Sequence, residues 1–218
     1  MEDPDALDAG DFGAWIDGMQ RALRGEQDAD VPCGGCTACC TASQFVHIAP
    51  DETDTLAHIP GELLFPAPLL PRGQMVLGYD EHGRCPMLGE AGCSIYEHRP
   101  RTCRTYDCRV FAAAAVDVDD DRASGIADRV RRWRFRVASS DDRVRRGAVE
   151  AAAARLAGAE QELGDGAVPS SPTQLAVLAV EVHDHFLRSV PETGGLEGAV
   201  PPASELADAV DGWSPGRA

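Results

Sequence analysis

The chain of 218 residues contains no lysine, so arginine is the only strongly basic side chain. Asp and Glu number 36 against 20 basic residues, which gives a formal net charge of −16. Nucleic acids and anionic membranes need a basic protein face, so we expect no general nucleic-acid binding and no membrane association. Apolar runs approaching the ~20 residues of a membrane-spanning helix are also missing.

Several motifs that would mark a common enzyme class are absent. The sequence has no Gly-x-Gly-x-x-Gly fingerprint, no P-loop and no His-Glu-x-x-His zinc motif. Nucleotide hydrolysis therefore has little support. The first residues, Met1-Glu2-Asp3-Pro4-Asp5, are acidic and do not resemble a signal peptide. We therefore expect a cytoplasmic protein in a reducing compartment, where disulfides are rare.

Cysteine is present eight times, and every copy falls in the first half of the chain. Four copies form one dense run, Cys33-x-x-Cys36-x-x-Cys39-Cys40, and the others are Cys85, Cys93, Cys103 and Cys108. A two-residue spacer lets neighbouring thiolates turn towards one centre, as in metal-binding knuckles and iron–sulfur loops. Adjacent side chains diverge, so we expect Cys39 or Cys40 to serve a second site, a bridge or a reactive role.

Two questions about these cysteines stay open at this point. An even count also fits a disulfide framework, although the expected reducing compartment favours metal binding. The identity of the metal is the second question. The Cys-x-x-Cys-x-x-Cys run and the later pair Cys85-Pro86 match parts of a ferredoxin loop, which favours iron–sulfur. Zinc remains the alternative, because thiolate sites accept both metals.

Hydrophobic periodicity and turn residues predict an α+β fold that is mostly helical. We expect a short strand at 45–48, a loop at 60–71 and a hairpin that pairs 75–79 with 84–88. The expected helices cover 11–25, 51–59, 100–116, 126–137, 141–163 and 173–190. These elements suggest a cysteine-cluster metal-binding domain over 11–116 and a helical extension packed on it over 123–190. A disordered tail is expected over 191–218, with a helical turn at 204–210.

The combined pattern resembles the YkgJ-like CxxCxxCC cysteine-cluster family, described as a zinc- or iron-chelating domain that includes flagellin lysine N-methylases. The resemblance covers residues 33–108 and rests on the dense run, on Arg84-Cys85-Pro86-Met87-Leu88, on Cys93-Ser94-Ile95-Tyr96-Glu97-His98-Arg99-Pro100-Arg101-Thr102-Cys103-Arg104 and on Cys108. It implies that all eight cysteines are metal ligands and that Tyr96, Arg99 and Arg104 are signature positions. It implies no particular reaction.

Electrostatics gives these signature arginines a role. Four thiolates around a 2+ zinc ion or cluster leave a net charge near −2, which is costly in a protein unless donors approach it. We therefore expect some of Arg99, Arg101, Arg104 and Arg109 to donate hydrogen bonds to sulfur or to pair with nearby carboxylates. The candidate cofactor-binding residues are Arg99, Arg104 and Tyr96. His98 is the only histidine we retain as a ligand or proton carrier.

Three functions follow from these residues. The first is a metal-binding protein with a [4Fe–4S] cluster and a redox or protein-modification role. The alternatives are a structural zinc module for protein interaction and an enzyme similar to the lysine N-methylases. The sequence identifies no catalytic residue, and the protein partner or substrate is unknown.

Overall fold

The computed structural model describes residues 4–29, 31–33, 35–68, 71–118, 123–159, 163, 168–211 and 213. Its contacts divide the chain into two compact units. The helical unit contains residues 1–27, 107–118 and 130–218, and the cysteine unit contains residues 28–106 and 119–129. The predicted domain limits cut across these units, because the cysteine unit is inserted after the first helix of the helical unit.

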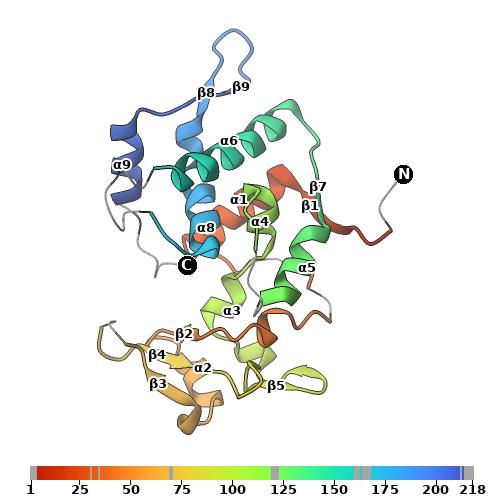
Figure 1. Ribbon diagram of the computed structural model, residues 1–218, viewed down its shortest axis with the longest axis vertical. Helices are drawn as coiled ribbons and strands as arrows, with labels where there is room; N and C mark the ends of the chain where they lie inside the picture. Colours follow the sequence, from red (N-terminus) through yellow and green to blue (C-terminus); the bar gives the residue numbers. More distant parts are fainter. Residues whose placement is uncertain are drawn as a thin grey trace. The chain divides into compact units, whose positions relative to one another are not determined.

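The helical unit begins with β1 (Leu7–Asp11), which leads directly into α1 (Phe12–Leu23). Asp11 caps α1 by accepting a hydrogen bond from the backbone N–H of Ala14, and α1 buries its apolar stripe as predicted. A second segment, β7 (Trp133–Arg136), pairs in parallel with β1 (Figure 1). The expected helix over 126–137 is therefore wrong at its end: α5 covers Ser124–Arg132 and a strand follows.

The reason for this strand lies in its alternating pattern. Trp133 is buried and Phe135 is partly buried, whereas the intervening arginines are exposed. The Phe135 ring packs against Phe12 at 5.3 Å and against Trp15 at 4.8 Å between ring centroids. This aromatic group joins the strand pair to α1, so packing overrides the helical spacing seen in the sequence.

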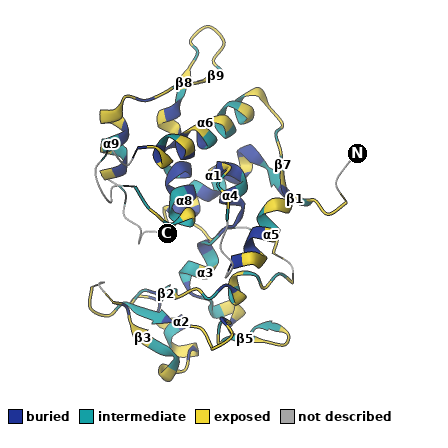
Figure 2. Cartoon of the chain, viewed as in Figure 1, coloured by how far each residue is buried: buried dark blue, intermediate teal, exposed yellow. Residues whose placement is uncertain are grey.

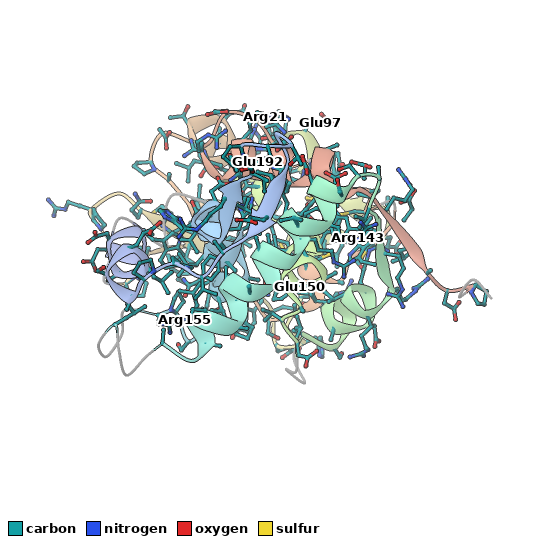
Figure 3. All side chains as sticks on the ribbon, turned by 90° about the horizontal axis from the view of Figure 1, so that it is seen from above. Arg21, Glu97, Arg143, Glu150, Arg155 and Glu192 are labelled. Atoms are coloured by element: carbon teal, nitrogen blue, oxygen red, sulfur yellow. The ribbon has the colours of Figure 1, made fainter. Side chains whose placement is uncertain are left out.

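Three further helices form the core of this unit: α4 (Arg109–Ala114), α6 (Ser140–Ala157) and α8 (Pro172–Val182). Ser139 and Asp142 form a reciprocal capping box at the start of α6. The buried residues of α6 are alanines together with Val149 and Leu156. This helix packs against α4 and α8, which are largely buried in Figure 2. Arg143, Glu150 and Arg155 lie along the outside of α6 (Figure 3). Because α6 ends at Ala157, the predicted end at 163 is wrong; residues 160–162 fall outside the described part.

The last part of the helical unit corrects the expected disordered tail. After α8, η5 (His183–Phe186) leads into β8 (Leu187–Ser189), which pairs antiparallel with β9 (Leu196–Gly198). A further helix, α9, spans Ala203–Asp211 and buries Leu206 and Val210. These two residues are one helical turn apart, so a single face of α9 packs on the unit. Residues 212 and 214–218 lie outside the described part of the chain.

The cysteine unit contains a three-stranded antiparallel sheet in the order β2 (Val46–Ile48), β4 (Met75–Leu77), β3 (Leu64–Pro66). The predicted hairpin between 75–79 and 84–88 is wrong, because β4 instead pairs with β2 and β3. The predicted loop over 60–71 also contains structure, namely η2 (Gly61–Leu63) and β3. The predicted strand near 45–48 and helix near 51–59 are confirmed as β2 and α2 (Thr53–His58).

A small apolar core stabilises the cysteine unit. Ile48, Ile59, Leu77 and Ile95 are buried together, and Cys85 and Cys93 are among the residues packed against them. Cys93 lies in β6 (Gly92–Cys93), which pairs with β5 (Leu88–Gly89). The apolar core thus holds Cys85 and Cys93 in place without the help of a metal ion.

The predicted helix over 100–116 is two helices. The first, α3 (Arg101–Thr105), closes the cysteine unit, and α4 opens the next segment of the helical unit. Tyr106 is extended, and the Asp107 carboxylate accepts a hydrogen bond from the N–H of Arg109. The helix is therefore interrupted between Cys103 and Cys108, and the two cysteines lie on different helical segments.

The mostly helical α+β class is confirmed, and no described helix has both the length and the apolar character to cross a membrane.

Candidate metal centre

The dense cysteine run folds as a series of tight backbone turns. The N–H of Cys36 donates to the carbonyl of Cys33 at 3.0 Å, and the N–H of Cys40 donates to Thr37 at 2.9 Å. A short helical turn, η1 (Cys39–Thr41), ends the run, and the Thr41 hydroxyl lies 3.2 Å from both the Thr37 and Ala38 carbonyls. The run is therefore a wrapped loop, as its two-residue spacing predicts.

A backbone hydrogen bond ties this loop to the next cysteine segment. The N–H of Cys85 donates to the carbonyl of Cys40 at 2.7 Å. From Cys85 the chain turns into β5 and β6, where Leu88 is the strand partner of Cys93. Cys40, Cys85 and Cys93 are thus brought together by main-chain geometry, although Cys40 and Cys93 are more than fifty positions apart.

The third segment, α3, carries Cys103 and is held by Glu52, the residue before α2, and by the backbone of β2. The buried carboxylate of Glu52 accepts hydrogen bonds from the N–H groups of Ala49 and Arg101. The Thr102 hydroxyl donates to the His47 carbonyl at 2.8 Å. These bonds fix α3 against the sheet, which places Cys103 on a firm support.

Electrostatics shows which thiols lie close enough to act on one another. Burial, followed by the negative charges of Cys85, Cys93, Cys36 and Cys33, raises the pKa of Cys40 to about 11. Burial, followed by the charges of Cys85, Cys40 and Cys93, raises the pKa of Cys103 to about 12. Burial and the charge of Cys93 likewise raise the pKa of Cys85, against a lowering by the Met87 backbone N–H. Cys103 is exposed as a whole residue, and the charges of these other three cysteines act on its sulfur.

Every pair within the set Cys40, Cys85, Cys93 and Cys103 is connected by one of these charge effects. We call this set the thiol quartet. One member comes from each of the loop, the following turn, the β6 strand and α3. Among the described residues, no three of these sulfurs lie within 4.8 Å of one another, so a cation would have to draw them together. A bound metal ion would favour this, because it removes their mutual repulsion and deprotonates them outright.

The remaining cysteines are placed differently. Cys33 and Cys36 act on Cys40 from the same loop, and Cys39 opens η1 beside it. Cys108 belongs to the helical unit, where it is buried and its sulfur accepts a hydrogen bond from the Trp133 indole N–H at 3.2 Å. The role of all eight as metal ligands stays a prediction, and the quartet is its best-supported part.

The predicted cofactor-binding residues lie beside the quartet or next to α3. The positive charge of Arg99 lowers the pKa of Cys103, in opposition to the sulfur charges. The same guanidinium stacks over the exposed Tyr96 ring at 3.7 Å and donates to the Tyr96 carbonyl. Arg104 lies 3.6 Å from Asp28, and among the described residues no group accepts a hydrogen bond from its buried Nε. That orphan donor fits an anionic group that the protein atoms do not supply.

Other arginines near the motif are paired with carboxylates. Arg101 binds Asp51 at 2.8 Å on the surface, and Arg109 binds Asp107 at 2.8 Å in the core of the helical unit. The Asp107 carboxylate also accepts a hydrogen bond from the Trp15 indole. Arg109 is therefore used to satisfy a buried charge, which explains its low exposure.

Sequence reasoning missed the part of α5 that supports the cysteine loop. Arg129 donates to the carbonyls of Pro32 and Cys33 at 2.9 and 3.2 Å. One turn earlier, an added Cβ on Gly125 would come within 3.4 Å of the Ala38 methyl group, so only a small residue fits there without adjustment. The arginines of the expected helix over 126–137 are alike in their local sequence, so no local signal marks Arg129 as a loop anchor.

His98 lies away from the dense run, at the end of η3 (Tyr96–His98), and bonds to Asp54. Sequence reasoning retained His98 but missed its partners Asp54 and His58. The spacing of those two residues, one turn apart on a predicted helix, was the available signal.

Comparison with known proteins agrees with the cysteine pattern. Residues 32–123 match the family model CxxCxxCC, described as "Putative zinc- or iron-chelating domain". The family resemblance seen in the sequence is thereby confirmed for this segment, and a metal-chelating cysteine cluster is its described property. Neither the curated proteins nor the solved structures gave a match to the chain.

Proposed function

We propose that the thiol quartet binds a [4Fe–4S] cluster and that the protein acts as a redox centre for a protein partner or substrate. The observation that carries the proposal is the convergence of the chain segments that hold these cysteines: the Cys85 N–H donates to the Cys40 carbonyl at 2.7 Å, and Cys85 and Cys93 pack against one apolar core. The effect of the Cys40, Cys85 and Cys93 charges on the pKa of Cys103 agrees with this arrangement. Four thiolates match the ligand number of a cubane cluster. Cys85 is a member of the quartet and is followed by Pro86, as the last cysteine of a ferredoxin loop is, which supports iron–sulfur over a single zinc ion.

The residues around the quartet would each assist such a group. The Arg99 guanidinium offsets the negative charge at Cys103, and the Met87 N–H stabilises the Cys85 thiolate. The orphan Nε of Arg104 is a donor for the cluster or for an anionic substrate next to it. When bound, an iron–sulfur cluster supplies one-electron transfer.

Exposure supports exchange with a partner. Within the quartet, Cys103 is exposed and Cys40, Cys85 and Cys93 are only partly covered; Cys33 and Cys39 of the neighbouring loop are exposed as well. A centre near the surface can transfer an electron over a short distance, while a purely structural zinc site gains nothing from exposure. The resemblance to a family that includes methylases also allows a role in protein modification. No described residue identifies a catalytic group for such a role.

The test is metal and sulfide analysis of protein purified anaerobically. We expect about four iron and four sulfide per chain, a brown solution that absorbs broadly at roughly 400 nm, and bleaching by dithionite. Cys40→Ser and Cys103→Ser should each lose most of the iron, because each removes one of four ligands. Colourless protein with stoichiometric zinc, even after anaerobic reconstitution with iron and sulfide, would instead establish the zinc module.

A further inference from the structure

A second group of ligand-type side chains lies in the cysteine unit, between α2 and η3. Asp54 and His58 are one turn apart on α2 and therefore share a face. His98 comes from η3 and stacks its ring on that of His58, with a centroid distance of 3.5 Å and an interplanar angle of 5°. The two imidazoles thus converge on one carboxylate.

The distances in this group suit a single small cation. Nδ1 of His98 lies 2.7 Å from one carboxylate oxygen of Asp54, and Nδ1 of His58 lies 3.7 Å from the other. One ligand atom from each of the three residues falls within 4.8 Å of the other two. A tetrahedral zinc ion with bonds of about 2.0–2.1 Å separates its ligand atoms by roughly 3.3 Å. The two separations from Asp54 bracket that value. Because the imidazole rings are stacked and nearly parallel, binding one ion also requires at least one ring to turn so that its nitrogen lone pair points at the ion.

Proton positions are compatible with this arrangement. Nδ1 of His98 donates to the Asp54 carboxylate, and Nδ1 of His58 donates to the Asp54 carbonyl at 2.8 Å. A neutral imidazole carries one proton, which either ring nitrogen can hold. Metal binding at both Nδ1 atoms places these protons on Nε2, so a neutral ring releases none. Binding the metal would break the two hydrogen bonds that these Nδ1 atoms donate to Asp54, both of which lie on a largely exposed surface.

One side of the group faces a pocket of about 240 Å³ lined by Asp54, His98, Glu97 and Arg99, among other residues. Three protein ligands with one open position are typical of zinc sites that bind water or a substrate. By contrast, a purely structural zinc site has four protein ligands. The open side therefore gives an ion at this position room for an exogenous ligand.

We propose that Asp54, His58 and His98 form a binding site for a divalent transition-metal ion of the zinc type, separate from the thiol quartet. Nitrogen and carboxylate ligands select such ions, whereas the thiol quartet suits iron–sulfur or zinc through sulfur. The cysteine unit then carries two metal sites of different chemistry.

The test uses protein that retains its cysteine-bound metal, dialysed against Zn²⁺ and analysed for metal content. We expect one additional zinc per chain. His58→Gln, His98→Gln and Asp54→Asn should each weaken its binding by roughly 100-fold or more, beyond the 10- to 100-fold typical of an outer-shell partner. His82→Gln is the matched control, because His82 is an exposed histidine of the same unit near a carboxylate, and it should change nothing.

A second measurement avoids any effect of substitution on folding. Wild-type protein is treated with diethyl pyrocarbonate with and without Zn²⁺, and the modified histidines are mapped by mass spectrometry. We expect zinc to protect His58 and His98 and to leave His82 reactive. No additional zinc, or equal binding by the His58→Gln and His82→Gln proteins, would overturn the site. Iron and sulfide are measured on the same samples, so the result is independent of the cluster proposal.

Discussion

Cys40 and Cys108 show how surroundings assign different roles to the same side chain. Cys40 is only partly covered and has four other sulfurs acting on it, so its thiolate is favoured only with a cation nearby. Cys108 is buried and receives an N–H hydrogen bond from Trp133. Its sulfur satisfies a buried indole donor, which is a structural task that needs no metal.

Replacing Cys108 separates these two roles. Cys108→Ala leaves the buried Trp133 N–H without this acceptor, so we expect the free energy of unfolding to fall by about 1–3 kcal/mol with bound metal unchanged. Cys108→Ser keeps an acceptor and should be milder. Chemical denaturation and metal analysis of both variants provide the measurement. Loss of metal in the Ser variant would identify Cys108 as a ligand, as the family motif implies.

The buried His183 predicts a pH dependence of stability. Burial lowers the pKa of His183, whose Nδ1 bonds to the Val180 carbonyl at 2.7 Å. The unfolded chain therefore takes up a proton first as pH falls below about 6.5, so this contribution is present above that pH and lost below it.

Denaturation at pH 7.5 and 5.5 measures this effect. The free energy of unfolding should decrease on acidification by at most about 1.4 kcal/mol per pH unit for one proton. His183→Gln should reduce the dependence. His185→Gln should retain it, because His185 is partly exposed and bonds to Glu205. Equal pH slopes in wild type and His183→Gln would contradict this account.

At the scale of elements, the sequence predicted best where the signal is local. Asp11 followed by an apolar 3.6-residue stripe predicted α1, and two-residue spacing predicted the wrapped cysteine loop. The strand Trp133–Arg136 was missed because its pairing with residues 7–11 and its aromatic contacts are long-range. The thiol quartet could not be selected from eight cysteines, since the Cys85–Cys40 backbone bond and the Glu52 bridge to α3 depend on tertiary structure.

The C-terminal elements give a direct test of the corrected tail. Deleting residues 191–218 removes β9 and α9, and with them the buried Leu206 and Val210. Burial of such side chains contributes about 1.5–3 kcal/mol each, so the free energy of unfolding should fall by roughly 3 kcal/mol or more. Deletion of 214–218 is the control and should have little effect. An unchanged melting temperature in the longer deletion would restore the disordered tail.

At the scale of the molecule, the cysteine unit is an insertion within the helical unit. Gln27 and Asp107 both belong to the helical unit, and Asp28–Tyr106 lies between them. If the insertion loses its fold, the helical unit must close a loop of roughly 80 flexible residues, at an entropic cost on the order of 4 kcal/mol. When the insertion is folded, it holds the ends of this loop together, so the helical unit does not have to meet that entropic cost.

Metal removal should therefore affect both units. We expect chelation to lower the melting temperature of the helical unit, although the quartet lies wholly in the other unit. The fluorescence of Trp15 and Trp133, which belong to the helical unit, reports this transition. The Cys40→Ser protein should show the lowered melting temperature without chelator, and adding chelator should change that temperature little. A helical unit whose transition is unchanged by chelation would show that the two units unfold independently.

The spread of the quartet over positions 40 to 103 also has a consequence for biosynthesis. A growing chain presents the dense run first, when Cys33, Cys36, Cys39 and Cys40 are its only thiols. A thiophilic ion captured at that moment would be held by neighbours in sequence instead of by the quartet. Contacts between residues far apart in sequence form late. If the quartet is the metal site, we therefore expect correct maturation to require delivery of the metal after Cys103 has been synthesised and α3 has docked.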